Sequence, residues 1–391
     1  MKEAVAGELA AAYNSALVDE VRANGFRYVS GRLTVHLAHE FGFCYGVDRA
    51  VDYAYQARRR FPGRNVFLTG EIIHNPHVNE RLRDNGIRFL SDPGEDRDTL
   101  GPDDVVILPA FGVTVGEMAQ LTSQGCTLVD TTCGSVLNVW KNVTRYARDG
   151  FTSIIHGKVK HEETRATASQ ALKYPGGRYL VVLDRDEAAV VCDFIRNGGD
   201  SAALAARFGP AASAGFDPVA DLVRIGCANQ TTMLMSESLA IGEMFRNAML
   251  DRYGAEALPR HFRAFDTICS ATQERQDAVI ALLDEQPLDL MLVVGGYNSS
   301  NTCNLARICA ERVRTFHIAD PDCLVSRDVV RHRPVGEPST TTGREEATRD
   351  WLPATGTLNI GLTAGASTPN NIVGYVIKQL EAFCEGSPLQ A

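Results

Sequence analysis

Short apolar runs alternate with stretches of helical periodicity along most of this chain. The first apolar runs lie at residues 34–38, 66–69, 105–108 and 127–130, and helical spacing occupies 47–60, 76–85 and 115–124. Further strand-like runs follow at 153–156, 179–183, 223–226, 290–295, 315–318 and 358–362. Strands that alternate with helices of this length are typical of parallel sheets. The pattern predicts an α/β protein with mostly parallel sheets.

Three blocks of this alternation, each of about a hundred residues, suggest internal repetition and predict three similar α/β domains. We expect an N-terminal helical extension at 1–31 and domains at 32–132, 133–268 and 269–362, with 363–391 packing back on the first. Leu9, Tyr13, Leu17 and Val21 recur every four residues, which predicts one amphipathic helix in the extension. The aperiodic stretches 197–218 and 334–350 are expected to be surface insertions.

Composition narrows the class of protein. The chain has 391 residues, a net charge of −9 and no block of lysine or arginine, so we expect no nucleic-acid partner. The longest apolar run, at 290–294, is too short to cross a bilayer, and the first thirty residues resemble neither a secretory signal nor a transit peptide. Ten cysteines without a secretion signal indicate reduced thiols or metal ligands, so we expect a cytoplasmic protein without membrane contact.

Three cysteines stand where a loop is expected to become a helix. Cys44 lies in Gly-Phe-Cys-Tyr-Gly-Val, whereas Cys133 and Cys269 share an Asp-Thr-X-Cys context. A helix N-terminus favours thiolate over thiol. A single free cysteine is more often a small buried hydrophobe, but three thiolates from separate segments suit an iron–sulfur cluster with one open iron.

Polar loops follow most of the predicted strands, and ligands gather at strand carboxyl ends in parallel sheets. These loops hold the candidate site residues His74, His161, Glu163, Thr231, Thr232, Ser299, Ser300, Asn301 and Ser367. Taken singly, each serine or threonine loop is more often a helix N-cap and each histidine a structural one. Together they offer imidazole, amide and hydroxyl donors for a diphosphate and one carboxyl group for proton delivery.

Several common cofactor motifs are missing from the sequence. It has no Gly-x-x-x-x-Gly-Lys-Ser/Thr loop, no Gly-x-Gly-x-x-Gly fingerprint after the first strand and no Cys-x-x-Cys pair. Neither a nucleotide-dependent nor a nicotinamide or flavin mechanism is supported. Any electrons that the reaction uses must come from an external donor.

As a set, the motifs resemble the IspH/LytB family, the 4-hydroxy-3-methylbut-2-enyl diphosphate reductases, and are closest to its cyanobacterial and plant branch. The matching segments occur in family order: Gly-Phe-Cys-x-Gly-Val at 42–47, Glu-Ile-Ile-His-Asn-Pro at 71–76, Asp-Thr-Thr-Cys at 130–133, His-Glu-Glu-Thr at 161–164, Asn-Gln-Thr-Thr at 229–232, Thr-Ile-Cys-x-Ala-Thr at 267–272, Asn-Ser-Ser-Asn at 298–301 and Thr-Ala-Gly-Ala-Ser-Thr-Pro at 363–369. They span nearly the whole chain.

The resemblance implies three α/β domains around a central cavity that holds the iron–sulfur cluster. It also implies an oxidoreductase of isoprenoid biosynthesis that acts last in the methylerythritol phosphate pathway. It would convert an allylic diphosphate to isopentenyl and dimethylallyl diphosphate, with electrons from a one-electron donor such as ferredoxin or flavodoxin. Cys44, Cys133 and Cys269 would hold a [4Fe–4S] cluster whose open iron meets the C4 hydroxyl. Glu163 would supply protons, assisted by Thr231. The diphosphate would contact His74, His161, Thr232, Ser299, Ser300, Asn301 and Ser367.

Two positions depart from the common bacterial pattern of the family. Phe111 stands where that form has a second diphosphate histidine, although the plant-like branch shares the phenylalanine, and Gly134 follows Cys133 where a proline is usual. Two other functions remain open. An open-iron dehydratase or lyase would turn over without added reductant, and a non-catalytic redox or iron sensor would not need Glu163 or the polar loops.

Overall fold

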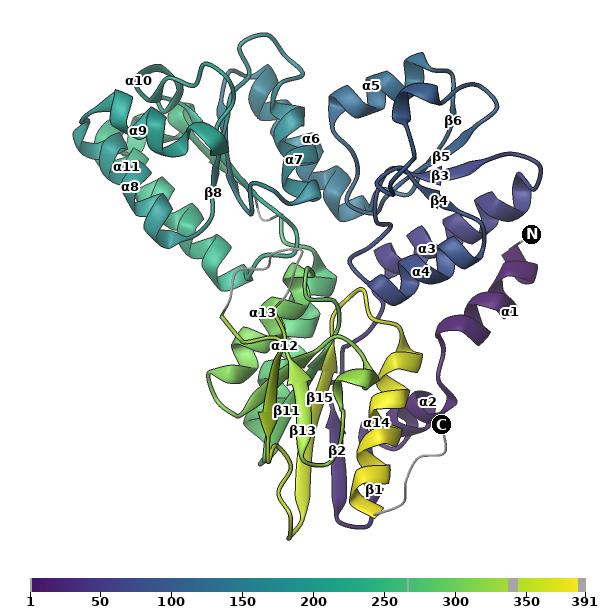
Figure 1. Ribbon diagram of the computed structural model, residues 1–391. Helices are drawn as coiled ribbons and strands as arrows, with labels where there is room; N and C mark the ends of the chain where they lie inside the picture. Colours follow the sequence, from purple (N-terminus) through teal and green to yellow (C-terminus); the bar gives the residue numbers. More distant parts are fainter. Residues whose placement is uncertain (1, 266, 337–343, 386–391) are drawn as a thin grey trace. The chain divides into compact units, whose positions relative to one another are not determined.

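The computed structural model describes residues 2–265, 267–336 and 344–385. The described residues form three sheets with mostly parallel strands and one two-stranded ribbon, with helices packed against the sheets (Figure 1). The predicted α/β class is therefore confirmed. The chain divides into two compact units: unit 1 contains Met1–Gly63, Glu71–Phe89 and Ser270–Ala391, and unit 2 contains Arg64–Gly70 and Leu90–Cys269.

The sheet of unit 1 has the order β1 (Arg27–Ser30), β2 (Leu33–Leu37), β15 (Leu358–Ala364), β11 (Leu290–Val294) and β12 (Thr315–Ile318). β1 forms an antiparallel hairpin with β2, and the other neighbours are parallel. Successive side chains of a strand point to opposite faces. In β11, Leu290 and Leu292 therefore pack with α14 (Asn370–Glu385), while Met291 and Val293 pack with α12 (Ser270–Glu285) and α13 (Ser300–Ala310).

The N-terminal segment forms two helices, α1 (Lys2–Tyr13) and α2 (Ala16–Ala23), so the prediction of one continuous amphipathic helix is wrong. Ser15 has an extended backbone and its hydroxyl accepts a hydrogen bond from the Val18 N–H at 3.3 Å, which starts a new helix. The other elements of unit 1 are α3 (Tyr45–Arg60), α4 (Pro76–Asp84), β4 (Arg88–Phe89), η3 (Pro321–Cys323) and the ribbon of β13 (Val329–His332) with β14 (Glu346–Arg349).

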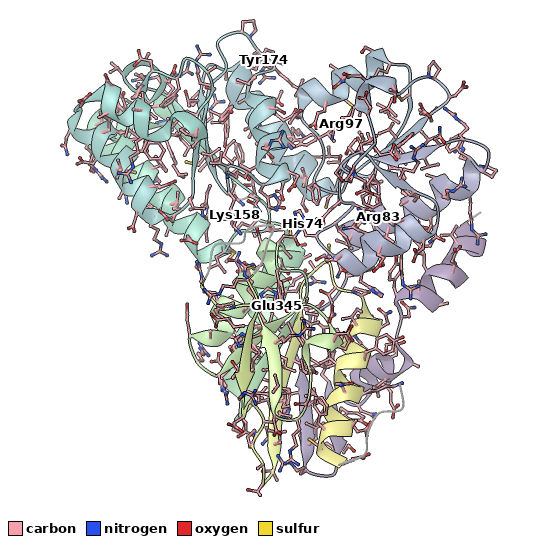
Figure 2. The ribbon with its side chains drawn as sticks, viewed as in Figure 1. His74, Arg83, Arg97, Lys158, Tyr174 and Glu345 are labelled. Atoms are coloured by element: carbon pink, nitrogen blue, oxygen red, sulfur yellow. The ribbon has the colours of Figure 1, made fainter. Side chains whose placement is uncertain are left out.

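In unit 2, three short parallel strands lie side by side: β3 (Val66–Leu68), β5 (Val105–Leu108) and β6 (Thr127–Asp130). Side chains of β3 and β5 pack with Leu121 of α5 (Val115–Ser123) in one apolar cluster. The short helix η1 (Arg97–Thr99) lies between β3 and β5 in the chain. Arg97, labelled in Figure 2, bonds the Thr69 carbonyl at 2.8 Å and Glu117 at 2.7 Å.

The second sheet of unit 2 is entirely parallel, in the order β10 (Phe262–Ala264), β9 (Ile225–Asn229), β7 (Thr152–His156) and β8 (Tyr179–Val182). One face packs against α8 (Arg185–Asn197) and α11 (Met235–His261). The other face packs against α6 (Gly134–Arg148) and α7 (Glu162–Ala171). Both faces are apolar, as expected for a parallel sheet covered on both sides.

The predicted insertions differ from expectation in one respect. The first contains α9 (Ser201–Phe208), η2 (Gly209–Ala211) and α10 (Pro218–Asp221), and Leu204 and Phe208 are buried in the core of this sheet. It is therefore not only a surface loop. In the second, residues 337–343 lie outside the described residues, and the part that follows forms β14.

The division into domains at 32–132, 133–268 and 269–362 stays a prediction. The strand expected near residue 34, in the first of these blocks, is β2, which pairs with β15 and shares its sheet with β11. The strand expected at 223–226 lies slightly later in the chain, as β9. Within residues 2–265, 267–336 and 344–385, each helix is too short or too polar to span a membrane.

Candidate functional site

The candidate residues lie just beyond the carboxyl ends of parallel strands. In unit 1, β2 leads to Cys44, β11 to the 295–301 loop and β15 to Ser367. In unit 2, β6 leads to Cys133, β7 to His161 and Glu163, and β9 to Thr231. Because the strands of one sheet are parallel, the loops after them leave from the same edge. Each unit therefore gathers its own set of candidate residues.

All three cysteines precede helices, as predicted. Cys44 is the N-cap of α3 and Cys133 the N-cap of α6, and neither thiol makes a capping hydrogen bond. Cys269 stands directly before α12. The residue at each position therefore lies near the positive end of a helix dipole, which favours a thiolate. These three cysteines are partly exposed, whereas Cys192, Cys227, Cys309 and Cys323 are buried.

The Cys133 loop is shaped by the residues of its Asp-Thr-Thr motif. Asp130 accepts hydrogen bonds from the Thr132 N–H at 2.9 Å and from its hydroxyl at 2.5 Å. The Cys133 N–H donates to the Ala110 carbonyl at 2.8 Å, which ties the loop after β6 to the loop after β5. Next to Ala110, the ring of Phe111 packs edge-to-face on His161, with ring centroids 6.2 Å apart. Phe111 thus supports one candidate ligand residue from the loop that positions Cys133.

His161 and Glu163 occupy the first turn of α7. His161 is the N-cap, and its Nδ1 accepts a hydrogen bond from the Glu163 N–H at 3.2 Å. Because Nδ1 accepts, a neutral ring carries its proton on Nε2. Glu163 is only 3 % exposed, and its Oε1 accepts a hydrogen bond from the Thr231 N–H at 2.6 Å. This contact joins the loop after β7 to the loop after β9.

Gln230 holds the same two loops together and received no role from the sequence. Its Oε1 accepts from the Lys158 N–H at 3.2 Å and from the Thr164 hydroxyl at 3.1 Å, while its Nε2 donates to the Thr232 hydroxyl at 2.8 Å. Lys158 is labelled in Figure 2. Gln230 is fully buried, so these hydrogen bonds hold both loops in place from the protein interior.

The loop that carries Cys269 is fastened to β9. The Thr267 hydroxyl accepts a hydrogen bond from the Asn229 N–H at 3.1 Å and also bonds the Asn229 side chain. The Cys269 N–H lies 3.5 Å from the Thr231 carbonyl oxygen. Within unit 2, Glu163, Thr231 and Cys269 are therefore connected through adjacent backbone.

In unit 1, His74 (Figure 2) is oriented by residues that the sequence reasoning left without a role. Its Nδ1 lies 2.8 Å from Glu71 Oε2, and that carboxylate also accepts a hydrogen bond from Asn298 Nδ2 at 3.0 Å. A carboxylate on Nδ1 holds the proton there, so Nε2 is the acceptor atom of the neutral ring. The next residue, Asn75, caps α4.

The loop after β11 meets both His74 and the loop after β15. The Ser367 hydroxyl lies 3.2 Å from the His74 carbonyl oxygen, and the Ala366 N–H donates to Asn301 Oδ1 at 2.9 Å. A Cβ at Gly296 would come within 2.5 Å of the His74 carbonyl oxygen, so this close approach requires glycine. Ser299 caps α13, and Ser300 begins that helix.

A histidine and a tyrosine support the base of this loop. His317 Nε2 lies 2.9 Å from the Gly295 carbonyl oxygen, and the Tyr297 and His317 rings pack edge-to-face at 5.1 Å. Burial lowers the pKa of His317 to about 4, so the ring is neutral at neutral pH. Burial also raises the pKa of Tyr297, whose hydroxyl donates to Glu345 at 3.0 Å.

A protein-family model described as LytB protein matches residues 35–381. The chain belongs to the LytB family. Among curated relatives, the 4-hydroxy-3-methylbut-2-enyl diphosphate reductase of Gloeobacter violaceus is 51% identical over 97% of this chain and 90% of its own. The protein of the same name from Thermosynechococcus vestitus is 48% identical over 97% and 92%, and that from a Synechococcus species is 49% identical over 98% and 94%.

Two solved structures share the LytB fold. One is an (E)-4-hydroxy-3-methyl-but-2-enyl diphosphate reductase, described as the terminal enzyme of the non-mevalonate pathway, with a TM-score of 0.52, 24% identity and coverage of 89% of this chain and 98% of its own. The other is the E-1-hydroxy-2-methyl-but-2-enyl-4-diphosphate reductase of Plasmodium falciparum, with a TM-score of 0.62, 20% identity and coverage of 88% and 87%. At these identities the likeness concerns the fold.

The structure joins the candidate residues of this LytB chain in two sets. His74, Asn301 and Ser367 are linked through hydrogen-bonded loops in unit 1, and His161, Glu163 and Thr231 in unit 2. That the three cysteines bind one cluster stays a prediction. Sequence reasoning missed Glu71, Asn298 and Gln230 as supporting residues. All three lie inside motifs that the sequence analysis singled out, and that position was the available signal.

Proposed function

We propose that this chain catalyses the reductive dehydroxylation of (E)-4-hydroxy-3-methylbut-2-enyl diphosphate to isopentenyl and dimethylallyl diphosphate. The observation that carries this proposal is the name shared by relatives that are about half identical over nearly the whole chain. The polar and thiol residues beyond the strand ends support it, because they supply the donors, the acid and the metal ligands that such a reaction needs.

The diphosphate is proposed to contact His74, His161, Thr232, Ser299, Ser300, Asn301 and Ser367. Asn301 gives this assignment a physical reason. Its Oδ1 accepts from the Ala366 N–H, which fixes the orientation of the amide, and its Nδ2 is buried without a hydrogen-bond partner among the described residues. An unsatisfied buried donor costs roughly 1–3 kcal/mol, so a ligand oxygen is expected at this atom. The N-terminus of α13, where Asn301 lies, also favours an anion.

Cys44, Cys133 and Cys269 are proposed to hold a [4Fe–4S] cluster. The donor set fits, since all three thiols stand before helix N-termini and three thiolates leave one iron of such a cluster without a protein ligand. When bound, the cluster would supply single electrons and a Lewis-acidic iron for the leaving hydroxyl group. The electrons are proposed to come from an external one-electron donor such as ferredoxin or flavodoxin.

Glu163 is proposed to deliver the proton. Its burial excludes bulk water from the carboxyl group, and the Thr231 N–H donates to Oε1. Since that bond favours a carbonyl-like Oε1, the transferable proton belongs on Oε2. Thr231 holds the carboxyl group in one orientation through its backbone, and its hydroxyl is proposed to order the substrate hydroxyl or a water molecule beside it.

One anaerobic experiment tests the proposal. The reconstituted chain is incubated with the hydroxylated diphosphate with and without reduced viologen. We expect both isomeric diphosphates to form only with reductant. Turnover without reductant would favour a lyase, and a bound cluster without turnover under either condition would favour a redox or iron sensor.

The ligand assignment is tested with single Cys→Ser variants at positions 44, 133 and 269. Each should lose iron and the broad visible absorbance of the cluster, because a hydroxyl is a poor substitute for a thiolate. Cys126→Ser is the matched control, since Cys126 is also partly exposed but lies in the apolar cluster beside α5. Full iron occupancy in any one of the three variants would remove that cysteine from the ligand set.

A further inference from the structure

Arg275 is a buried cation whose described contacts are all with backbone carbonyls. It lies on α12, six residues after Cys269, and is only 3 % exposed. Its Nη2 donates to the Gly42 carbonyl at 2.7 Å and to the Phe43 carbonyl at 3.2 Å, and its Nε donates to Gly42 at 3.2 Å. Its Nη1 donates to the Ala271 carbonyl at 2.8 Å. The guanidinium therefore bridges the segment that ends in Cys44 and the helix that follows Cys269.

The segment before Cys44 is closely packed at the point that Arg275 contacts. Gly42 has a φ of +78°, and a Cβ there would come within 2.7 Å of Asn370 Oδ1. The Cys44 N–H donates to the Ala366 carbonyl at 3.1 Å. Arg275 completes this arrangement by bonding the carbonyls of Gly42 and Phe43. Without the guanidinium, the carbonyl groups of Gly42 and Phe43 would both lose this hydrogen-bond donor, and leaving such acceptors unpaired destabilises the segment.

The charge of Arg275 is as informative as its hydrogen bonds. In the part of the chain that the structure describes, no carboxylate pairs with this guanidinium. A buried charge normally has a charged partner because its desolvation is expensive. Covalent geometry limits the distance from Nη2 to the Cys44 sulfur to about 9 Å, because the contacted Phe43 carbonyl belongs to the peptide bond that precedes Cys44. A negatively charged sulfur ligand is thus within electrostatic reach.

We infer that Arg275 is a positioning residue for the iron–sulfur cluster, which fixes the Cys44 ligand and raises the reduction potential of the cluster. The inference rests on the proposed function. A nearby buried cation stabilises the more electron-rich state, and the net charge around a cluster is one of the main determinants of its potential. Groups that orient metal ligands from outside typically contribute 10–100-fold to metal affinity. Both effects follow from one guanidinium.

The test compares Arg275→Gln, Arg275→Lys and the wild-type chain after anaerobic reconstitution. Two quantities are measured: the rate of iron release to a chelator and the midpoint potential from a spectroscopic redox titration. Arg275→Gln should release iron about 10–100-fold faster, the range for lost ligand-orienting groups, and its potential should become more negative. Arg275→Lys should keep a potential near that of the wild type, because the charge remains. It should still release iron faster, because an ammonium group lacks the planar fork that bonds several carbonyls at once.

Arg312→Gln is the matched control. Arg312 is exposed in the same unit and pairs with Asp284 of α12, so its loss removes a charge without touching the Cys44 segment. It should leave both quantities unchanged. An unchanged potential or an unchanged release rate in Arg275→Gln would overturn the inference. If Arg275→Gln does not fold, Arg275→Lys tests the inference. An iron-release rate equal to that of the wild type would contradict it, and so would a midpoint potential that shifts although the positive charge is kept. A wild-type chain that takes up no iron would instead refute the proposed function.

Discussion

Replacing Glu163 with glutamine separates catalysis from binding. In the wild type the Thr231 N–H donates to Glu163 Oε1 at 2.6 Å. The glutamine amide keeps an oxygen that can accept this hydrogen bond, but it cannot release a proton. The side chain is buried, and Glu163 contacts the proposed diphosphate ligand His161 through its backbone N–H, which glutamine keeps. Turnover should fall by about 10²–10⁴-fold, the usual contribution of a general acid. At 1.36 kcal/mol per factor of ten, this corresponds to roughly 3–5 kcal/mol of activation free energy.

Glu163→Gln should lower the free energy of unfolding by less than it raises the activation free energy. The largest loss is that of the ionised form of Glu163: a hydrogen bond to a charged acceptor contributes roughly 1.5–3 kcal/mol and a neutral one roughly 0.5–1.5 kcal/mol, so the exchange removes at most about 1 kcal/mol. A carboxylate in the first turn of α7 adds roughly 0.3–1 kcal/mol through the helix dipole. The unfolding free energy should therefore fall by no more than about 2 kcal/mol. A purely structural role of Glu163 predicts a loss of turnover that follows this loss of stability, whereas proton delivery predicts a much larger loss of turnover.

The assay measures the reduction rate with excess chemical reductant, together with substrate affinity, iron content and thermal unfolding. Asp186→Asn is the matched control, because Asp186 is the second residue of α8 just as Glu163 is the second residue of α7, but it is exposed. The control should lose only the helix-dipole contribution. A Glu163→Gln enzyme that binds substrate, keeps its cluster and turns over within about threefold of wild type, well short of a general-acid effect, would refute the assignment.

Two further changes probe the loop after β11. Gly296→Ala should weaken substrate binding, because its Cβ would lie only 2.5 Å from the His74 carbonyl oxygen and would displace that loop. Gly134→Ala is the control, because a Cβ there meets open space; it should preserve binding and raise the free energy of unfolding by about 0.4–1 kcal/mol. Equal substrate affinity in both variants by calorimetry would contradict the first expectation. In the folded protein the pKa of His317 is about 4, whereas in the unfolded chain the ring binds a proton below about pH 6.5. The free energy of unfolding should therefore fall as the pH drops from about 6.5 to about 4. Urea unfolding at pH 7 and pH 5 should show a smaller fall in His317→Gln, and an equal fall would refute the attribution.

Local periodicity predicted most elements of this fold because a strand or helix leaves its signature in neighbouring residues. The runs at 105–108, 127–130 and 315–318 coincide with β5, β6 and β12. Pairing partners were not predictable in the same way. β2 pairs with β15, which lies more than three hundred residues later, with Leu33 opposite Leu358. An apolar strand satisfies its hydrogen bonds equally well beside any parallel neighbour, so only the packing of the whole unit selects one.

The N-terminal segment shows where local periodicity fails to predict an element. The four-residue spacing from Leu9 to Val21 is real, but the hydroxyl of Ser15 interrupts the helix and starts α2. Ser15 also packs closely against α14, because a Cβ at Gly374 would lie 2.3 Å from its hydroxyl. A local pattern cannot report a neighbour that belongs to the other end of the chain.

The sequence alone indicated which residues are chemically equipped for the candidate site and that they lie between the end of a strand and the first turn of the next helix. Thiols at three helix starts, His161 before α7 and Asn301 in the first turn of α13 are all readable from local motifs. Only the tertiary structure decided which distant groups support them: Asn298 on Glu71, the Thr231 N–H on Glu163 and Arg275 on the Cys44 segment. A buried polar group must find a partner, but the sequence does not say which distant atom the folded chain brings within three ångströms.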